Sequence, residues 1–235
     1  MTRPWETLDG VDTAEGWLEL RRRGERDFVI TVGGRVLMNS ALHRTEAALA
    51  EAACSQIAGR ERPRVLIGGL GMGITVRAAL DVLPRQARVV VAEIEPAIVR
   101  WCRGPLAALT GSAIKDRRVT IEMADVTQLI TAASRRDGAC FDAILLDLYE
   151  GPRAAAQARD DPFYGPRALE RTREALAPGG VFAVWSEDAD PAFAKRLRAA
   201  GFSVATLRPG KGGPRHVVYL ADAGRERSRG SVPAP

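Results

Sequence analysis

The sequence predicts an α/β fold whose mostly parallel sheet is covered by helices on both faces. From residue 64 onward, continuous apolar runs typical of buried strands alternate with segments of helical periodicity. The first apolar run leads into a turn crowded with glycine, as expected where a ligand approaches the backbone after the first strand. The last two predicted strands follow each other without a helix between them, which indicates an antiparallel final strand.

Residues 1–60 have a different pattern and are expected to form a small N-terminal element. Short alternating pieces surround Gly33-Gly34, a dipeptide typical of a β-hairpin turn. The next stretch, RTEAALAEAACSQIAG, is expected to be a helix, since Leu49 and Ile57 fall on one side of it. We therefore expect a hairpin plus a helix before the main domain.

The main domain is expected to span residues 61–222, with strands and helices in regular alternation. Proline at the first helical position and glycine just past the end mark its helices, as at Pro96 and Gly104. The expected strands are 64–70, 87–94, 118–125, 141–148 and 181–187, with two more within 202–221. The expected helices are 74–83, 96–104, 126–134, 165–176 and 190–201. Residues 223–235 are predicted to be a disordered tail.

The bulk composition excludes several classes of protein. The chain has 235 residues, 46% hydrophobic side chains and a formal net charge of +5, which suits a globular domain. It has no apolar run of about 18 residues and no apolar leader, so we expect a cytoplasmic protein that does not bind membranes. Its arginines form no basic stripe with interleaved aromatics, so nucleic acid is not an expected partner.

Cysteine and histidine usage gives no sign of a metal centre. Cys54, Cys102 and Cys140 are widely spaced, include no CxxC pair and lie among apolar residues, so we expect free thiols. The chain contains two histidines, too few for a histidine-based site. No metal is therefore expected.

The stretch VLIGGLGMGIT, residues 65–75, contains the strongest local sign of a ligand. The dinucleotide spacing GxGxxG fails, because Ile74 or Val76 would occupy its last glycine position. No Gly-Lys-Ser/Thr follows, which excludes a P-loop. The spacing that fits is GxGxG, formed by Gly69, Gly71 and Gly73. It is typical of enzymes that bind a nucleoside through a sulfonium amino-acid portion, as in S-adenosylmethionine.

One acidic residue ends each of the next three predicted strands. Glu93 is suited to accept hydrogen bonds from both ribose hydroxyls, and Asp125 from an adenine amino group. Asp147 stands where the reacting centre should lie. The adjacent Ile94 and Val126 complete the expected nucleoside-binding set. The alternative is that each acid caps the helix that follows it.

Acidic residues concentrate at or just past the predicted strand ends, although the net charge is positive. Such a rim would attract a cationic small molecule as the acceptor. Acidic caps on strand-to-helix loops explain the same pattern equally well. The residues are Glu93, Glu95, Asp125, Asp147, Glu150, Asp160, Asp161, Glu187, Asp188 and Asp190.

Several motifs together resemble the spermidine synthase family over roughly residues 64–200. They are VLIGGLGMGITVRAAL, VVVAEIEPAIV, VTIEMADV, FDAILLDLYEGP, DPFYG and ALAPGGVFAVWSE. The resemblance implies a seven-stranded, Rossmann-like sheet of the class I methyltransferase type, a nucleoside sulfonium ligand and attack by an amine. It also implies that Glu93 holds the ribose and Asp125 the adenine, and that the chain pairs as a homodimer.

The resemblance assigns the chemistry to Asp147-Leu148-Tyr149-Glu150. Family members carry Asp-x-x-Asp there, which orients and deprotonates the attacking amine, and this chain has an acid at both places. Tyr149 would serve as a positioning hydroxyl or a cation–π wall. The chain departs from the family at Gly71, where spermidine synthases carry an aspartate that pairs with the amine of decarboxylated S-adenosylmethionine. The donor is therefore expected to be either that compound or S-adenosylmethionine itself.

Three classes of function stay open at this point. The first is transfer of an alkyl group of the aminopropyl type to a small amine, and the second is methyl transfer to a small molecule. The third is a non-catalytic nucleoside-binding protein, because a fold does not fix a function. The motif DPFYG is either a lid or a helix-entry turn, and Trp185 either packs in the core or contacts the acceptor. Asn39, His43 and Glu46 are candidates to close the site from above.

Overall fold

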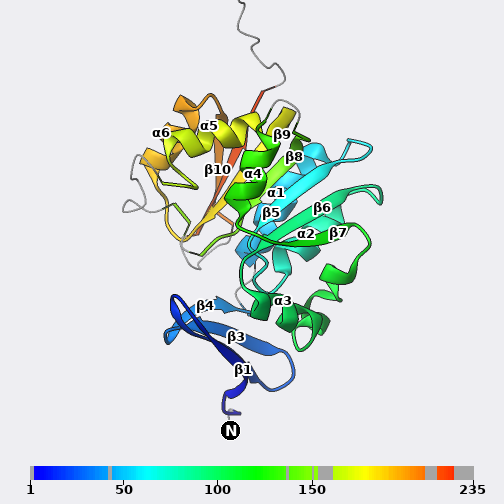
Figure 1. Ribbon diagram of the computed structural model, residues 1–235, viewed down its shortest axis with the longest axis vertical. Coiled ribbons are helices and arrows are strands. Elements are labelled where there is room, and N and C mark those ends of the chain that lie inside the picture. The colour runs from blue at the N-terminus through cyan, green and yellow to red at the C-terminus, as the bar shows by residue number, and fades with distance from the viewer. Residues whose placement is uncertain are drawn as a thin grey trace, which may run out of the picture.

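The computed structural model contains two sheets, with helices packed on both faces of the larger one (Figure 1). It describes residues 3–41, 44–135, 138–149, 151–152, 161–209 and 216–224. The prediction of a disordered tail falls almost entirely outside the described residues.

The N-terminal sheet is antiparallel, and its four strands are neighbours in chain order. The predicted hairpin is present, and Gly33 and Gly34 have φ values of 53° and 79°, as a type I′ turn requires. The sheet extends beyond that hairpin, since a further strand, β1, pairs with β2. The sequence gives no apolar signal for β1, because none of its side chains is fully buried. The strands are β1 (Glu6–Thr13), β2 (Gly16–Arg23), β3 (Asp27–Val32) and β4 (Arg35–Asn39).

The larger sheet has seven strands in the order β10-β11-β9-β8-β5-β6-β7. Strands β5 to β9 pair in parallel, and β11 is antiparallel to both β9 and β10. This confirms the predicted seven-stranded α/β fold with an antiparallel final strand. The strands are β5 (Arg64–Gly68), β6 (Arg88–Glu93), β7 (Val119–Met123), β8 (Phe141–Leu146), β9 (Leu176–Ser186), β10 (Ser203–Leu207) and β11 (Val217–Asp222).

Two apolar cores cover the two faces of this sheet. Val65 and Ile67 of β5 belong to the core that contains residues of α1, α2 and α3, whereas Leu66 belongs to the core with residues of α4, α5 and α6. Successive side chains of a strand point to opposite faces, so a strand covered on both sides has an unbroken apolar sequence. The helices are α1 (Arg44–Ile57), α2 (Ile74–Val82), α3 (Pro96–Arg103), α4 (Val126–Ala133), α5 (Pro166–Glu174) and α6 (Pro191–Ala199).

Two local features differ from the prediction. Strand β9 begins at Leu176, which pairs with Phe141, and the register then shifts across Pro178-Gly179-Gly180, which the sequence predicts to be only a turn. Two 3-10 helices, η1 (Ala107–Thr110) and η2 (Ala113–Lys115), join α3 to β7. Both are too short to show a helical period in the sequence.

The N-terminal sheet lies against the end of the large sheet where the parallel strands finish, next to α3 (Figure 1). Oδ2 of Asp9 in β1 accepts hydrogen bonds from Nη2 of Arg100 and Nε1 of Trp101 in α3, both at 2.7 Å. The bond to Arg100 and then that to Trp101 lower the pKa of the Asp9 carboxyl. Among the described residues, no helix is long and apolar enough to cross a membrane.

Candidate active site

The glycine turn joins β5 to α2 at the point where the strand order reverses. Gly69, Gly71 and Gly73 have φ values of 89°, 51° and 79°, a region that other residues rarely occupy. A Cβ on Gly69 would lie 2.6 Å from the carbonyl oxygen of Asp147. The left-handed backbone therefore favours glycine at all three positions, and at Gly69 the close approach of the Asp147 carbonyl leaves no room for a side chain.

Glu93 is buried at the end of β6 and is held against the glycine turn. Its Oε2 accepts a hydrogen bond from the Leu70 amide at 2.9 Å, and its Oε1 accepts one from the Glu95 amide at 2.8 Å. Each carboxylate oxygen keeps lone-pair capacity for a further donor. Glu93, the residue predicted to hold the ribose, thus lies beside the glycine turn.

Two sulfur-containing side chains line the middle of the turn. The Cys102 thiol donates a hydrogen bond to the Gly71 carbonyl at 3.2 Å. Burial, together with the charge of Glu93, raises the pKa of Cys102 to about 12, so the thiol keeps its proton. From the other side, Met38 of β4 covers Gly71, since a Cβ there would lie 2.4 Å from the Met38 Sδ. Neither contact has a signal in the sequence.

Asp125 follows β7 and caps α4. Its Oδ1 accepts hydrogen bonds from the Thr127 amide and the Thr127 hydroxyl, both at 2.8 Å. The capping alternative therefore holds for Asp125, as it does for Glu95 at α3 and Asp190 at α6. The Oδ2 of Asp125 has no hydrogen bond within the described part of the chain.

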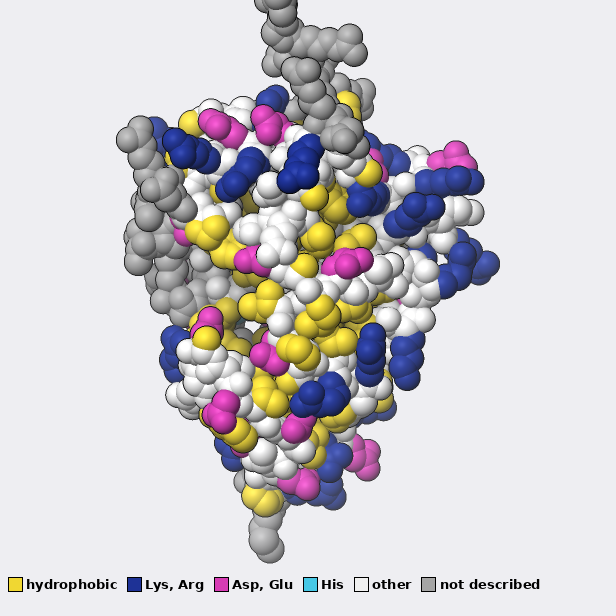
Figure 2. Space-filling view, in the orientation of Figure 1, with side chains coloured by type: hydrophobic (Ala, Val, Ile, Leu, Met, Phe, Trp, Pro, Cys, Tyr) yellow, Lys and Arg dark blue, Asp and Glu magenta, His cyan; other side chains and the backbone are white. Residues whose placement is uncertain are grey.

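The remaining predicted nucleoside contacts differ in accessibility. Ile94 is 73% exposed and Met123 is 51% exposed, so the ends of β6 and β7 present apolar side chains to solvent. Val126 is buried and packs on Gly68, where a Cβ would lie 2.9 Å from the Val126 Cγ2. In Figure 2, hydrophobic side chains gather across the middle of this face with acidic ones among them, while basic side chains concentrate toward the upper part and the right-hand side.

Asp147 directly follows β8, at the same edge of the sheet. The half-buried carboxyl accepts a hydrogen bond from the hydroxyl of Thr75 in α2. Loss of hydration raises the pKa of Asp147 to about 7, the Glu46 carboxylate adds to the rise, and the Thr75 hydrogen bond opposes it. A carboxyl that exchanges a proton near neutral pH is suited to general acid–base chemistry.

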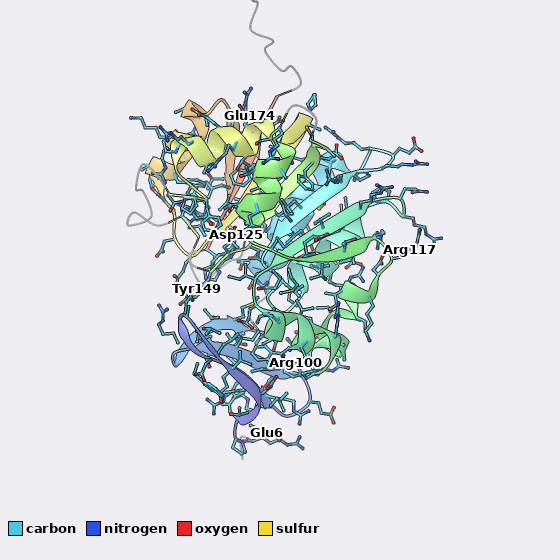
Figure 3. All side chains as sticks on the ribbon, viewed as in Figure 1. Glu6, Arg100, Arg117, Asp125, Tyr149 and Glu174 are labelled. Atoms are coloured by element: carbon cyan, nitrogen blue, oxygen red, sulfur yellow. The ribbon has the colours of Figure 1, made fainter. Side chains whose placement is uncertain are left out.

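Tyr149 lies between the two sheets (Figure 3) and is 43% exposed. The Arg35 guanidinium, at the start of β4, stands 5.5 Å from the centre of its ring. The aromatic face therefore already meets a cation of this chain. Glu150, the second predicted acid, lies outside the described residues, as do His43 and Asp160.

The DPFYG segment shows the features of a helix-entry turn. Asp161 Oδ1 accepts hydrogen bonds from the Phe163 amide at 2.9 Å and the Tyr164 amide at 2.5 Å. Tyr164 is buried, and its hydroxyl has no hydrogen-bond partner among the described residues. Burial, with the charges of Asp161 and Asp147, raises the pKa of that phenol. The sequence analysis singled out the DPFYG motif but gave Tyr164 no role of its own.

A group that the sequence analysis missed surrounds the hydroxyl of Thr45. The Trp185 Nε1 donates to it at 3.2 Å, and it donates to Glu46 Oε2 at 2.9 Å. His216 Nδ1 lies 3.1 Å from the same oxygen. Glu46 and Trp185 are candidates from the sequence, but Thr45 and His216 are not, because no spacing connects residues so far apart in the chain. The described residues contain no cluster of His, Cys, Asp or Glu that could hold a metal ion.

The strand order and the carboxyl-edge site define a class I methyltransferase-like α/β fold. Among solved structures, the chain is similar to a spermidine synthase from Thermotoga maritima, with a TM-score of 0.70, 17% identity, and coverage of 94% of this chain and 74% of that one. It is also similar to a spermidine synthase in complex with the transition-state analogue AdoDATO (TM-score 0.69, 16% identity, 94% and 73% coverage).

A third similar structure is a probable spermidine synthase from Corynebacterium glutamicum, with a TM-score of 0.60, 19% identity, and coverage of 97% of this chain and 83% of that one. The fold of the present chain is therefore spermidine synthase-like. At these identities the similarity establishes the fold and leaves the reaction to be argued from the site. No protein-family model and no curated protein matches the sequence.

Proposed function

We propose that the chain is a transferase that moves an alkyl group from an S-adenosylmethionine-type sulfonium nucleoside to a small cationic amine. The observation that carries the proposal is the Glu93 carboxylate, which accepts the Leu70 amide of the glycine turn at 2.9 Å. It supplies a ribose anchor beside a turn that brings main-chain atoms close to the ligand. Asp147 supplies the proton acceptor at the end of a neighbouring parallel strand.

The residues at the ends of β5, β6 and β7 fit the proposed donor. Glu93 has lone pairs left for the ribose hydroxyls, and the second carboxylate oxygen of Asp125 has one for the adenine amino group. Ile94 supplies exposed apolar surface for the base, while the buried Val126 supports Gly68 from behind. The glycine turn, Gly69 to Gly73, receives the sulfonium portion.

The chemistry asks little of the protein beyond alignment and one proton transfer. The amine nitrogen forms a bond to the carbon attached to sulfur, and the bond between that carbon and sulfur breaks, leaving its electron pair on a neutral thioether. Because the acceptor binds as an ammonium, its nitrogen first gives one proton to the Asp147 carboxylate, which frees the electron pair that forms the new bond. Alignment of the reacting atoms contributes roughly 7–11 kcal/mol to the lowering of the barrier.

Tyr149 and Glu150 complete the proposed acceptor side. Glu150 is assigned as the second acid that attracts and orients the amine. Tyr149, with Arg35 on its ring, is assigned as a wall of the acceptor site. Because amines of this kind are protonated at neutral pH, with a pKa near 10.4 by analogy with lysine, acids at both positions would favour a cationic acceptor.

A second candidate function is methyl transfer from S-adenosylmethionine to a small acceptor. It is favoured by the environment of Gly71, where the Met38 thioether fills the space that a side chain at 71 would need. No acid at this position pairs with the amine of a decarboxylated donor. Ordinary S-adenosylmethionine, which carries its own carboxylate, is then not disfavoured by repulsion.

Calorimetric titration with S-adenosylmethionine, its decarboxylated form and a nicotinamide dinucleotide tests the proposal. We expect one or both sulfonium compounds to bind and the dinucleotide not to bind. Glu93→Gln should lose most of this affinity, whereas Glu95→Gln, which keeps an oxygen to cap α3, should retain it. Binding of the dinucleotide alone would refute the proposal.

Product analysis separates the remaining classes. Incubation of each donor with short aliphatic diamines, followed by mass spectrometry, distinguishes an added aminopropyl group from an added methyl group. A chain that binds nucleoside but forms no product with any amine, and for which Asp147→Asn changes nothing, would be a binding protein. The cytoplasmic location, the homodimer, and the absence of nucleic-acid and membrane partners stay predictions.

A further inference from the structure

The hydroxyl of Thr45 forms hydrogen bonds with its neighbour Glu46 and with two distant parts of the chain. Its hydroxyl oxygen lies 3.2 Å from Trp185 Nε1, 2.9 Å from Glu46 Oε2 and 3.1 Å from His216 Nδ1. Thr45 is buried, and the Trp185 and His216 rings pack edge to face with centroids 4.9 Å apart. The group is therefore a packed unit rather than a set of surface contacts.

The number of protons in this group is constrained. A hydroxyl donates one hydrogen and accepts at two lone pairs, an indole nitrogen only donates, and an ionised carboxylate only accepts. The Trp185 indole must therefore donate to the Thr45 oxygen, and Thr45 must use its single hydrogen on Glu46. Nothing is left for Thr45 to donate to the imidazole, so the Nδ1 of His216 has to be the donor.

The group lies at the carboxyl edge of the large sheet, the edge at which Asp147 follows β8. Strand β11 is antiparallel to β9, and Val217, the residue after His216, pairs with Ser186, the residue after Trp185. His216 and Trp185 thus lie where the parallel strands end, as does Asp147. Glu46, the last member of the hydrogen-bonded series, acts electrostatically on Asp147.

We propose that Thr45, locked in place by Trp185 and by a His216 that carries its proton on Nδ1, is a positioning residue that holds the Glu46 carboxylate beside Asp147. The inference rests on the proposed function and extends it. The two carboxyl groups then form one anionic unit that binds an aliphatic ammonium and takes a single proton from it. Repulsion between the two like charges favours retention of that one proton.

The first test is the protonation of His216 in the full-length chain without substrate. Imidazole ¹⁵N chemical shifts distinguish a protonated from an unprotonated ring nitrogen, and the two histidines of the chain are assigned with His43→Gln. We expect the neutral His216 to carry its hydrogen on Nδ1. A hydrogen on Nε2 would overturn the proposal, because Nδ1 would then need the proton that Thr45 gives to Glu46.

The second test follows the titration of Asp147 by carboxyl ¹³C NMR, with Asp147→Asn to identify the signal. The ionisable groups that face Asp147 or its neighbours are Glu46 of α1, Tyr164 before α5 and His216 before β11. Thr45→Val keeps the side-chain shape but releases Glu46, so the Asp147 midpoint should fall by at least about half a pH unit. Thr45→Ser should restore it.

An unchanged Asp147 midpoint in Thr45→Val would overturn the proposal even if the enzyme turned over normally. Neither NMR test needs a substrate, so both can be carried out even if no transferase activity is found. Failure of the proposed function and failure of this proposal are therefore distinguishable. If Thr45→Val did not fold, Trp185→Phe, which removes only one donor to Thr45, should give a smaller fall of the same sign, and no fall would count against the proposal. With active enzyme, Thr45→Val should lower kcat more than it changes the donor KM.

Discussion

The two halves of the carboxyl edge are built in different ways. On the glycine-turn side, the Glu93 carboxylate accepts two backbone amides, and one of them belongs to a residue 23 positions away. On the β8–β9–β11 side, the contacts join side chains that are 140 and 171 positions apart. The first half is fixed by hydrogen bonds to the backbone, whereas the second depends on side-chain hydrogen bonds whose strengths depend on one another.

The two halves also differ in the groups that surround their carboxyls. Glu93 accepts hydrogen bonds from two backbone amides, those of Leu70 and Glu95. Loss of hydration, and then the charge of Glu46, raise the pKa of Asp147 to about 7, although the single Thr75 hydroxyl bond opposes the rise. A carboxylate held in place by two backbone amides is suited to accepting hydrogen bonds from a ribose, and a carboxyl that titrates near neutrality is suited to moving a proton. Under the proposed function, one edge of the sheet would therefore hold the donor at one side and transfer the proton at the other.

Asp147→Asn should have the largest effect and should separate catalysis from donor binding. We expect kcat to fall about 10²–10⁴-fold, as for loss of a general base, while the affinity for the sulfonium donor stays unchanged. Steady-state kinetics and calorimetry on the same preparation measure the two quantities. Asp222→Asn, at the opposite edge of the sheet, keeps its acceptor oxygen for the Gly224 amide and should leave both unaltered. A parallel loss of donor affinity in Asp147→Asn would break the division.

The backbone-built half should be most sensitive at Gly69. Gly69→Ala places a Cβ 2.6 Å from the Asp147 carbonyl in a left-handed conformation, so the free energy of unfolding should fall by about 2–4 kcal/mol. Gly34→Ala is the matched control, since its φ is 79° and no atom lies within 4 Å of the added Cβ. It should lose only about 1 kcal/mol. Urea denaturation gives both values, and equal losses would contradict the close-packing argument.

The free energy of unfolding as a function of pH should report the raised pKa of Asp147. The pKa of an aspartate carboxyl is ordinarily 3.8, as in the unfolded chain, and that of Asp147 is about 7 in the folded chain. Between these values the folded chain binds more protons than the unfolded chain, so the stability contributed by this group is lost as pH rises through about 7. At about pH 8, Asp147→Asn should therefore be more stable than the unmodified chain by on the order of 4 kcal/mol, with the difference vanishing at about pH 3. Thermal unfolding of both proteins between about pH 3 and about pH 8 measures this difference. A variant that is less stable than the unmodified chain at about pH 8 would contradict the prediction.

Met38 connects the glycine-turn half to the N-terminal sheet, and a double-mutant cycle with Gly71 measures the connection. Gly71→Ala should clash with the Met38 Sδ, 2.4 Å from the added Cβ. Removal of that sulfur in Met38→Ala should make Gly71→Ala less damaging, with a coupling of about 1 kcal/mol. Additive effects on unfolding in urea would mean that the two residues do not share this space.

The smallest effect is expected at Asp9, which joins the N-terminal sheet to α3 through exposed groups. Asp9→Asn keeps an oxygen for the Trp101 indole but loses the charge that faces Arg100. Because such partly exposed pairs contribute little, the loss of stability should be under about 1 kcal/mol and should shrink further in high salt. A larger loss would show that this junction, rather than Met38, fixes the N-terminal sheet.

Much of the fold could be predicted from the sequence, because its signals are local. The apolar run through Val65 and Ile67 is unbroken since both faces of β5 are covered, and the glycine spacing reports the left-handed turn that follows. Glu93 could be found because it stands at a strand end, a position that every parallel sheet brings to one edge. The position of Asp147 at the reacting centre could be predicted in the same way, whereas its role as the base for an amine came from the resemblance to a family.

What the tertiary structure alone decided is the surroundings of those residues. A sequence shows Asp125 as an acid after a strand, but only the fold shows its first oxygen engaged in capping α4. Met38 over Gly71 and the hydroxyl of Thr45 between Trp185 and His216 require segments that fold back from far along the chain. Side-chain contacts at such separations leave no period or spacing in the sequence, whereas strands and turns are encoded by residues that are neighbours in it.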